Sequence, residues 1–263
     1  MKKRSIVCMA AAALILSLTA CGDSESGGTS QPNQPSESSV ASAPESDPQP
    51  DKEEAAEKEG EEAYDISYTS VKTYTNSIGT TYAQVIVEIE NTGTADLYLS
   101  SGSYDLEDAN GKLITSNSLV STYPEVISPG EKAYMYEEDM LDEAVEGELT
   151  VLPRPSVEKA KISNIRYSVT DVEINSDQYG FLKARGRVEN TTAEDEDGMV
   201  YVVLILKDAN GTPIGQMFTI VTEDFAAGSK IGFEASGISL PDSVTADAIA
   251  SYDVFAYPMQ MQF

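Results

Sequence analysis

The chain has 263 residues, with 44 acidic and 17 basic side chains, no His and no Trp, and its formal net charge at pH 7 is −27. A chain this acidic repels phosphate backbones, so we expect no nucleic acid among its partners. Without an imidazole, catalysis by a Ser-His-Asp or Cys-His arrangement and zinc ligation by His are excluded. The length is sufficient for one or two domains with their own hydrophobic cores.

The first twenty residues have the layout of a secretory signal peptide. Three basic residues, Lys2 to Arg4, precede an apolar run from Ile6 to Leu18. That run is too short to cross a hydrocarbon core of roughly 30 Å as a permanent helix, and it fits the apolar stretch of an export signal. We therefore expect residues 1–20 to be removed during export.

The end of this segment, Leu18-Thr19-Ala20-Cys21, resembles the lipobox of bacterial lipoproteins. The resemblance implies cleavage before Cys21 and attachment of a diacylglycerol thioether, a palmitate-type anchor, to its sulfur. Two acyl chains suffice for stable anchoring, so the mature protein would be held at the extracytoplasmic face of the cell membrane without spanning it. The alternative is an ordinary signal peptide that is cut after Ala20.

Cysteine usage agrees with a lipid anchor. The two Cys of the chain are Cys8, which leaves with the signal, and Cys21, which would be acylated. The exported part would then have no free thiol and no possible disulfide, so its stability must come from core burial. Exported proteins without Cys are common in Gram-positive bacteria, and we expect that origin.

Residues 21–64 form a distinct compositional segment that we expect to be a disordered stalk. The first part is rich in Ser, Pro and Gly, and residues 51–62 contain seven acids and two lysines. Such a sequence has too little apolar surface to offset the entropy of ordering. We interpret it as a solvated acidic spacer between the anchor and the folded part, with a binding role as the alternative.

After residue 64 the apolar pattern predicts an all-β fold. Ala83 to Glu90 alternates with a period of two, and so does Leu182 to Glu189, as is typical of half-buried strands. Met199 to Leu206, MVYVVLIL, is a continuous apolar run and predicts a central strand that is buried on both faces. The other predicted strands are residues 66–74, 97–106, 112–120, 131–137, 147–152, 162–175, 213–222, 229–236 and 248–257.

Three short motifs occur twice in the same order, about 100 residues apart, which indicates a duplicated domain of about 95 residues. We place the boundary near Pro153-Arg154-Pro155, because two prolines so close together do not fit a central strand, and residues 156–160 would be a short linker. The predicted domains are residues 65–153 and 160–263. The motif pairs are Ile89-Glu90-Asn91-Thr92 with Val188-Glu189-Asn190-Thr191, Asp108-Ala109-Asn110-Gly111 with Asp208-Ala209-Asn210-Gly211, and Pro129-Gly130-Glu131-Lys132 with Ala227-Gly228-Ser229-Lys230.

Several segments of the second copy form a recognisable pattern: Gly186-Arg187-Val188-Glu189-Asn190-Thr191, Val202 to Asp208, Gly211, and Ala227-Gly228 before Phe233. With this pattern the second copy resembles the FxLYD family of extracytoplasmic domains, although the family's aromatic residue before the Asp is replaced here by Leu206-Lys207. The first copy is similar to the same family or to related domains of unknown function in Firmicute lipoproteins. The resemblance implies immunoglobulin-like β-sandwiches, two in tandem, and no catalytic residues.

The repeated Asp-Ala-Asn-Gly motif predicts a hairpin turn, in which Asn and Gly supply two positions that accept a positive φ. A calcium loop of the EF-hand type would need an oxygen ligand two residues before the Asp, where Leu106 and Leu206 stand. A separate acidic loop contains four carboxylates in a row. We read it as a solvated turn, with weak Ca²⁺ binding through Glu194, Asp195, Glu196 and Asp197 as the alternative.

Other polar and aromatic groups give no sign of catalysis. Glu137-Glu138-Asp139 and Asp142-Glu143 predict a second solvated acidic patch, and no phosphate-binding glycine loop or serine-nucleophile motif occurs. Tyr82, Tyr134 and Tyr136 are interpreted as packing residues with their hydroxyls at the rim, with an exposed binding face as the alternative. The tail, residues 257–263, would close a sheet edge or contact a partner.

The sequence thus favours a membrane-anchored lipoprotein that binds or scaffolds at the cell envelope, without enzymatic activity or an obligatory cofactor. An envelope protein is the expected partner. The alternative is an accessory or regulatory subunit of an envelope transporter or enzyme.

Overall fold

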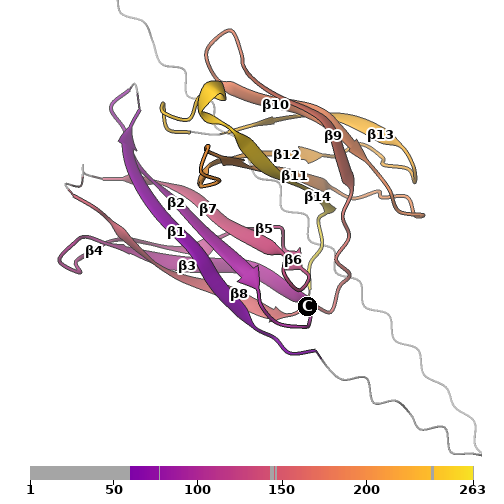
Figure 1. The fold of residues 1–263 in the computed structure, drawn as a ribbon, viewed down its shortest axis with the longest axis horizontal. Helices are drawn as coiled ribbons and strands as arrows, with labels where there is room; N and C mark the ends of the chain where they lie inside the picture. Colours follow the sequence, from indigo (N-terminus) through magenta and orange to yellow (C-terminus); the bar gives the residue numbers. More distant parts are fainter. Residues whose placement is uncertain (1–59, 77, 143–144, 146, 238–239, 263) are drawn as a thin grey trace, which may run out of the picture. The chain divides into compact units, whose positions relative to one another are not determined.

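Antiparallel strands make up nearly all the regular structure in the computed structural model (Figure 1). The model describes residues 60–263 except 77, 143–144, 146, 238–239 and 263. The predicted all-β class is therefore confirmed. The signal segment, Cys21 and the expected stalk up to residue 59 lie outside the described residues.

The N-terminal half consists of two sheets that enclose a common core. One sheet has the strand order β1-β2-β7-β5, and the other is built on β3, which pairs with β4, β6 and β8. Alternate residues of β2, such as Val85 and Val87, pack with Leu99 and Leu106 of β3 in one buried cluster, as the period-two pattern predicts. The strands are β1 (Tyr64–Thr75), β2 (Thr81–Asn91), β3 (Leu97–Glu107), β4 (Leu113–Val120), β5 (Thr122–Tyr123), β6 (Val126–Ile127), β7 (Lys132–Leu141) and β8 (Thr150–Lys159).

The C-terminal half has the strand order β14-β11-β12-β13-β10-β9. A single residue pair, Phe218 with Ser236, joins β12 to β13, so the sheet divides naturally into two three-stranded layers. A second buried cluster holds residues of both layers, including Leu204 of β11 and Ala235 of β13. The elements are β9 (Ser168–Ser176), β10 (Leu182–Glu189), β11 (Val200–Lys207), β12 (Pro213–Val221), β13 (Lys230–Ser236), the 3-10 turn η1 (Ala246–Ala248) and β14 (Ser251–Pro258).

The two halves repeat the same strand pairing. The layer β1-β2-β7 corresponds to β9-β10-β13, and the layer β8-β3-β4 corresponds to β14-β11-β12. The duplicated motifs fall at equivalent points of this arrangement, which supports the repeat inferred from the sequence. The described residues nevertheless belong to one compact unit, so the division into two separate domains stays a prediction.

The repeated hairpin has one conformation in both halves. Asp108 Oδ1 accepts the backbone N–H groups of Asn110 and Lys112, and Asp208 Oδ1 does the same with Asn210 and Thr212. The hairpin prediction is confirmed, but the expected geometry is wrong in one respect. Only the glycine of each turn has a positive φ, 76° and 78°, so the turn is a type I turn followed by a left-handed glycine.

The repeated Asn after β2 and β10 holds two loops together in each half. Asn91 Nδ2 donates to the carbonyls of Ala95 and Ile127, and Asn190 Nδ2 donates to those of Glu194 and Phe225. Both side chains are buried, and each amide is satisfied by two backbone carbonyls. The sequence predicted a local turn, and the partner more than 30 residues away was missed.

The segment with two prolines differs from the prediction. Pro153 and Pro155 lie inside β8, which runs to Lys159 and includes most of the expected linker. Among the described strands β8 pairs with β3 alone, so it is an edge strand, and the open side of an edge strand tolerates residues without an N–H. The two prolines correctly indicated that this segment is not a central strand. The sequence analysis did not consider that they could lie in an edge strand.

The folded part also begins earlier than expected. Tyr64 is the first residue of β1, and the Glu61 carbonyl accepts the N–H groups of Thr94 and Ala95. The last residues of the predicted stalk therefore dock on the loop between β2 and β3.

Candidate functional site

The two halves meet through the outer faces of β2, β7 and β11. Tyr134, Val203, Ile205 and Tyr257 form a buried cluster of their own between the two cores. The side chains of β11 alternate between this cluster and the C-terminal core, which confirms the prediction that the run is buried on both faces. The partly buried rings packed against the cluster are Tyr123, Tyr201, Phe218 and Phe255.

β2 differs from its prediction at this junction. Its alternation predicted one buried and one solvated face, yet Gln84 and Ile86 on the second face are each only 1% exposed and Glu88 is 7% exposed. Gln84 lines a small cavity together with Asp208 and Ile214 of the C-terminal half. The other half of the chain therefore covers a face that the sequence pattern assigns to solvent.

Polar contacts flank the apolar cluster. The Tyr134 hydroxyl donates a 2.7 Å hydrogen bond to Asp253 Oδ2, and the same carboxylate oxygen receives Lys207 Nζ at 2.5 Å. Lys207 Nζ also lies 5.9 Å from the centre of the Tyr134 ring, within the range of a cation–π contact. The buried Tyr134 hydroxyl and the half-buried Asp253 carboxylate are thus hydrogen-bonded to each other across the junction.

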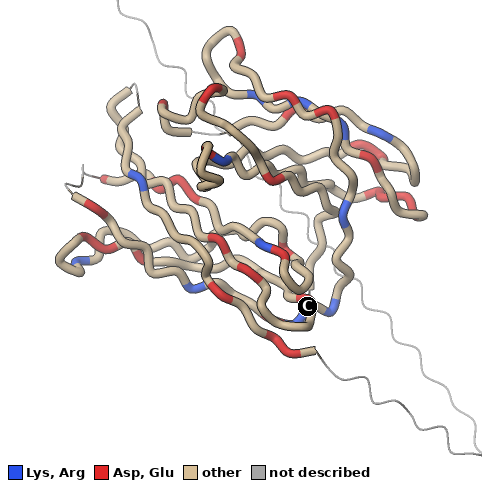
Figure 2. Tube along the Cα trace, in the orientation of Figure 1, with Lys and Arg blue, Asp and Glu red and all other residues tan. Residues whose placement is uncertain are grey.

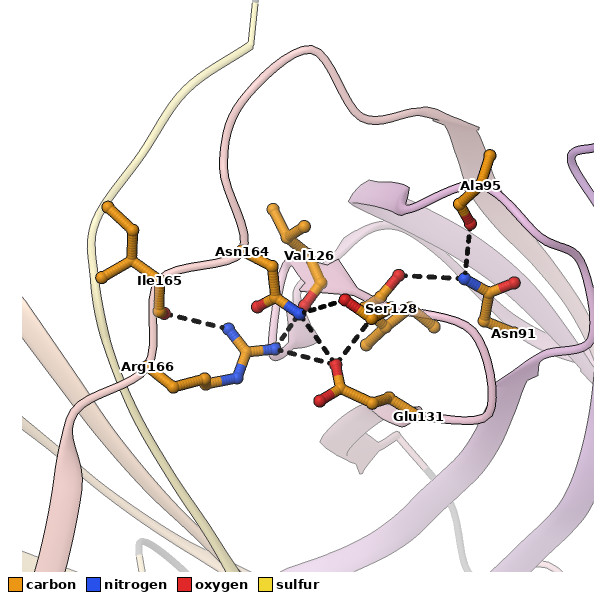
Figure 3. Close-up of polar contacts among 9 residues, drawn as sticks. Asn91, Ala95, Val126, Ser128, Glu131, Asn164, Ile165 and Arg166 are labelled. Atoms are coloured by element: carbon orange, nitrogen blue, oxygen red, sulfur yellow. Dashed lines mark hydrogen bonds and ion pairs between the residues drawn. The ribbon is translucent and has the colours of Figure 1, made fainter. Parts of the chain in front are cut away.

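A second cluster of polar contacts, centred on Arg166, joins the two halves (Figure 3). Asn164 Nδ2 donates to Ser128 Oγ and to Glu131 Oε2, both at 2.9 Å. The Arg166 guanidinium donates to the carbonyl of Val126 and lies 3.7 Å from Glu131 Oε2. Burial lowers the pKa of Arg166, and the nearby Glu131 opposes this effect.

An open cavity of about 300 Å³ lies at the junction, at the lower end of the range of roughly 300–1,000 Å³ that is typical of small-molecule sites. Tyr136 and Glu138 are two residues apart on β7 and share one face of the strand. Residues of β12 and β13 supply other parts of the wall. The lining residues are Ser121, Tyr123, Tyr136, Glu137, Glu138, Gln216, Phe218 and Ser236.

Burial dominates the electrostatics of this cavity. It raises the pKa of Glu138 to about 7, with a hydrogen bond from Tyr136 acting in the opposite direction and the charge of Glu137 adding to the rise. Burial also raises the pKa of Glu137. Two carboxyl groups are therefore held where their charged forms are poorly solvated. The predicted solvated patch at Glu137-Glu138-Asp139 is wrong for all three residues, since Asp139 accepts hydrogen bonds from Tyr104 and Asn117.

A chain of hydrogen bonds fixes the Glu138 carboxylate. Gln84 Nε2 donates to the Tyr136 hydroxyl at 3.0 Å, and that hydroxyl donates to Glu138 Oε1 at 2.5 Å. The carboxamide oxygens of Gln84 and Gln216 are sealed from solvent and accept no hydrogen bond from the described residues. Gln216 in the cavity wall and Gln84 behind it thus each have a carboxamide oxygen that could still accept a hydrogen bond. No sequence signal marked Gln84 or Gln216.

The residues singled out from the sequence as calcium candidates do not form such a site. Glu196 accepts hydrogen bonds from the Tyr167 hydroxyl and from the backbone of Gly198, and Asp195 Oδ1 accepts the N–H of Ala227. Glu194 and Asp197 are exposed. Within the part of the chain that the structure describes, no group of three or more Asp, Glu, His or Cys side chains is arranged to hold a metal ion.

The tyrosines and the tail have structural roles that the sequence in part predicted. Tyr134 is fully buried and packs at the junction, and Tyr82 stacks on Tyr74 with their ring centres 5.5 Å apart. In the tail, the Met259 N–H donates to the Met199 carbonyl, and Gln262 Nε2 donates to the carbonyl of Lys159. The tail therefore continues past β14 beside the start of β11 and reaches the last residue of β8, and whether it closes an edge or contacts a partner stays a prediction.

No protein-family model matches the chain, and no curated protein matches it either. The resemblance to lipoproteins and to FxLYD domains stays a prediction from the quoted motifs. In the described residues no helix is long and apolar enough to cross a membrane.

Proposed function

We propose that the protein is a lipid-anchored extracytoplasmic binding or scaffolding module at the cell envelope of a Gram-positive bacterium. The lipobox-like segment that ends at Cys21 supports the anchor, and the acidic residues 21–59 would form the spacer. Two immunoglobulin-like β-sandwich domains in tandem would form the binding part, and no catalytic role is assigned to any residue.

The observation that carries a binding role is the cavity at the junction. Its wall combines the half-buried Glu138 carboxyl group with aromatic rings, and this side chain is oriented by Tyr136 and Gln84. Keeping carboxyl groups out of water costs stability unless they are paired, so such a constellation is typical of sites that meet a ligand. Acidic residues recur over both halves, so we expect a basic or cationic partner (Figure 2).

The second candidate is an accessory or regulatory subunit of an envelope transporter or enzyme. The buried cluster between the halves favours it, because two joined sandwiches present one continuous surface to a larger assembly. Chemical cross-linking of the full chain in intact cells, followed by mass spectrometry, separates the two candidates. A transporter or enzyme among the products supports the accessory role. Absence of any cross-linked envelope protein would contradict the accessory role and any role in binding or scaffolding an envelope protein.

The anchor is tested with one substitution and a matched control. Cys21→Ala should leave the chain unprocessed or release it into the medium, whereas Cys8→Ala, within the expected signal, should leave processing and membrane retention unchanged. The measurement is the distribution of the protein between membrane and medium. Membrane retention of a normally processed Cys21→Ala chain would rule out the lipid anchor.

A further inference from the structure

We infer that the junction cavity receives one organic cation, a guanidinium or alkylammonium group. This inference rests on the proposed binding function and names the chemistry of its ligand.

The wall presents a carboxylate and an unpaired carboxamide oxygen beside the hydroxyl groups of Ser and Tyr. Glu138 contributes the carboxylate, and the sealed Gln216 oxygen has no donor within the described residues. No Lys or Arg lines the cavity, and no salt bridge reaches Glu137 or Glu138 in the described part of the chain. A ligand that satisfies this wall must bring donors and positive charge, as an ammonium or guanidinium group does.

The apolar part of the wall suits the same kind of group. The rings of Tyr123 and Phe218 lie 5.6 Å apart with an angle of 38° between them, and Tyr136 adds a third ring to the lining. Tyr and Phe rings attract cations over their faces. A planar guanidinium can stack on a ring while its N–H groups reach a carboxylate in the plane, which a compact hydrated metal ion cannot do.

Behind the wall, Gln84 and Tyr136 hold the Glu138 carboxylate in place. Gln84 is 1% exposed, and its carboxamide is used on one side only, since Nε2 donates to Tyr136 while the oxygen lacks a donor. This buried amide and the Tyr136 hydroxyl fix Glu138 in one orientation before any ligand arrives. Such preorganisation lowers the entropy that binding must overcome.

A divalent metal fits this cavity less well. Ca²⁺ takes six to eight oxygen ligands, and the described residues contain no group of three carboxylates that could begin such a shell. A single organic cation needs only one or two carboxylates and an aromatic wall.

Protonation gives the inference a distinctive signature. Glu138 is surrounded by the Tyr136 hydroxyl, by Glu137 and by Tyr74, and burial raises its pKa to about 7. At neutral pH the Glu138 carboxyl group is therefore protonated in a fraction of the ligand-free molecules. A cation favours the ionised carboxylate, so its arrival should expel that proton, and its affinity should rise as the pH increases from 6 to 8.

The test is an isothermal titration of the mature chain with n-butylguanidinium, and with the neutral n-butylurea as a control of the same shape. We expect saturable binding of the cation, at least tenfold weaker binding of the urea, and proton release that shows as a dependence of the heat on the buffer. Glu138→Gln should weaken binding of the cation at least tenfold. Glu158→Gln, which removes the same charge from an exposed position on β8, should change it less than twofold.

A parallel titration with a short peptide that carries one arginine identifies the source of the cation. Tighter binding of the peptide than of n-butylguanidinium indicates a side chain of a protein partner, and equal binding indicates a free small molecule. Both support the site. Equal affinities for the cation and the urea, or unchanged binding by Glu138→Gln in a chain whose thermal unfolding is normal, would overturn it. Envelope cross-links that persist in Glu138→Gln would then show that the proposed function survives without this site.

Discussion

The hydroxyl of Tyr134 and the carboxylate of Asp253 are joined by a 2.7 Å hydrogen bond across 119 positions of sequence. Tyr134 comes from β7 and Asp253 from β14, so this bond ties the N-terminal half of the chain to the C-terminal half. It lies beside the aromatic cluster that seals the junction, and the stability of that junction can be tested through it.

Tyr134→Phe removes the hydroxyl and keeps the ring. We expect a loss of about 1–2 kcal/mol in the free energy of unfolding, because a hydrogen bond to a charged acceptor is lost while Lys207 still pairs with Asp253. Urea unfolding measures the loss. The control is Tyr179→Phe, whose side chain is 75% exposed and whose replacement should change stability by less than about 0.5 kcal/mol. Equal effects of the two substitutions would contradict a structural role of the bond.

Asn190→Ala should be more damaging. The substitution removes one donor from each of the carbonyls of Glu194 and Phe225 and leaves a gap where the fully buried side chain stood, so we expect a loss of roughly 2–4 kcal/mol, with Asn91→Ala similar in the other half. The measurement is again urea unfolding. Asn175→Ala, at an exposed position of β9, serves as the control and should have little effect. A neutral result at Asn190 would show that the two loops are held by other contacts.

Stability should fall as the pH rises from about 4.5 to about 7. Burial raises the pKa of Glu125 and of Glu138 to about 7, so the folded chain binds more protons than the unfolded chain in this window. The free energy of unfolding decreases with pH wherever the folded state binds more protons. Glu88 has a lowered pKa, so it stabilises the folded chain as a carboxylate. This contribution is lost only when the pH falls below the ordinary pKa of a glutamate, outside the window considered.

The measurement that isolates this effect is urea unfolding of the native chain and of Glu125→Gln between pH 5 and pH 8. The glutamine variant has no proton to lose, so its stability should decline less over the window. Parallel pH profiles for the two chains would contradict the assignment of a raised pKa to Glu125.

Gly211→Ala should cost about 1 kcal/mol because the residue has a φ of 78°, a conformation that alanine avoids, although its side chain would meet open space. Gly211→Asn should cost less, since asparagine tolerates this region better. Thermal unfolding ranks the three chains. A larger loss for asparagine than for alanine would mean that sterics rather than φ control the position.

The junction explains why part of the candidate site was visible in the sequence and part was not. In β11 both faces are apolar, since Val202 and Leu204 face one core while Val203 and Ile205 face the junction, and the continuous run predicts this burial. The matching face of β2 carries Gln84 and Glu88, which a pattern of polarity assigns to water. Polar residues that are buried by a distant part of the chain have no local signature.

The sequence by itself determined the all-β class, the approximate bounds of the long strands and the two equivalent hairpins. These features follow from side chains that alternate along a strand and from the turn preferences of Asp, Asn and Gly, all of which act within a few residues. The tertiary structure alone decided which carboxylates are buried, where Pro153 and Pro155 are tolerated, and which loops Asn91 and Asn190 connect. Those outcomes depend on contacts between residues tens to more than a hundred positions apart, and the long-range packing that creates them leaves no periodic trace in the chain.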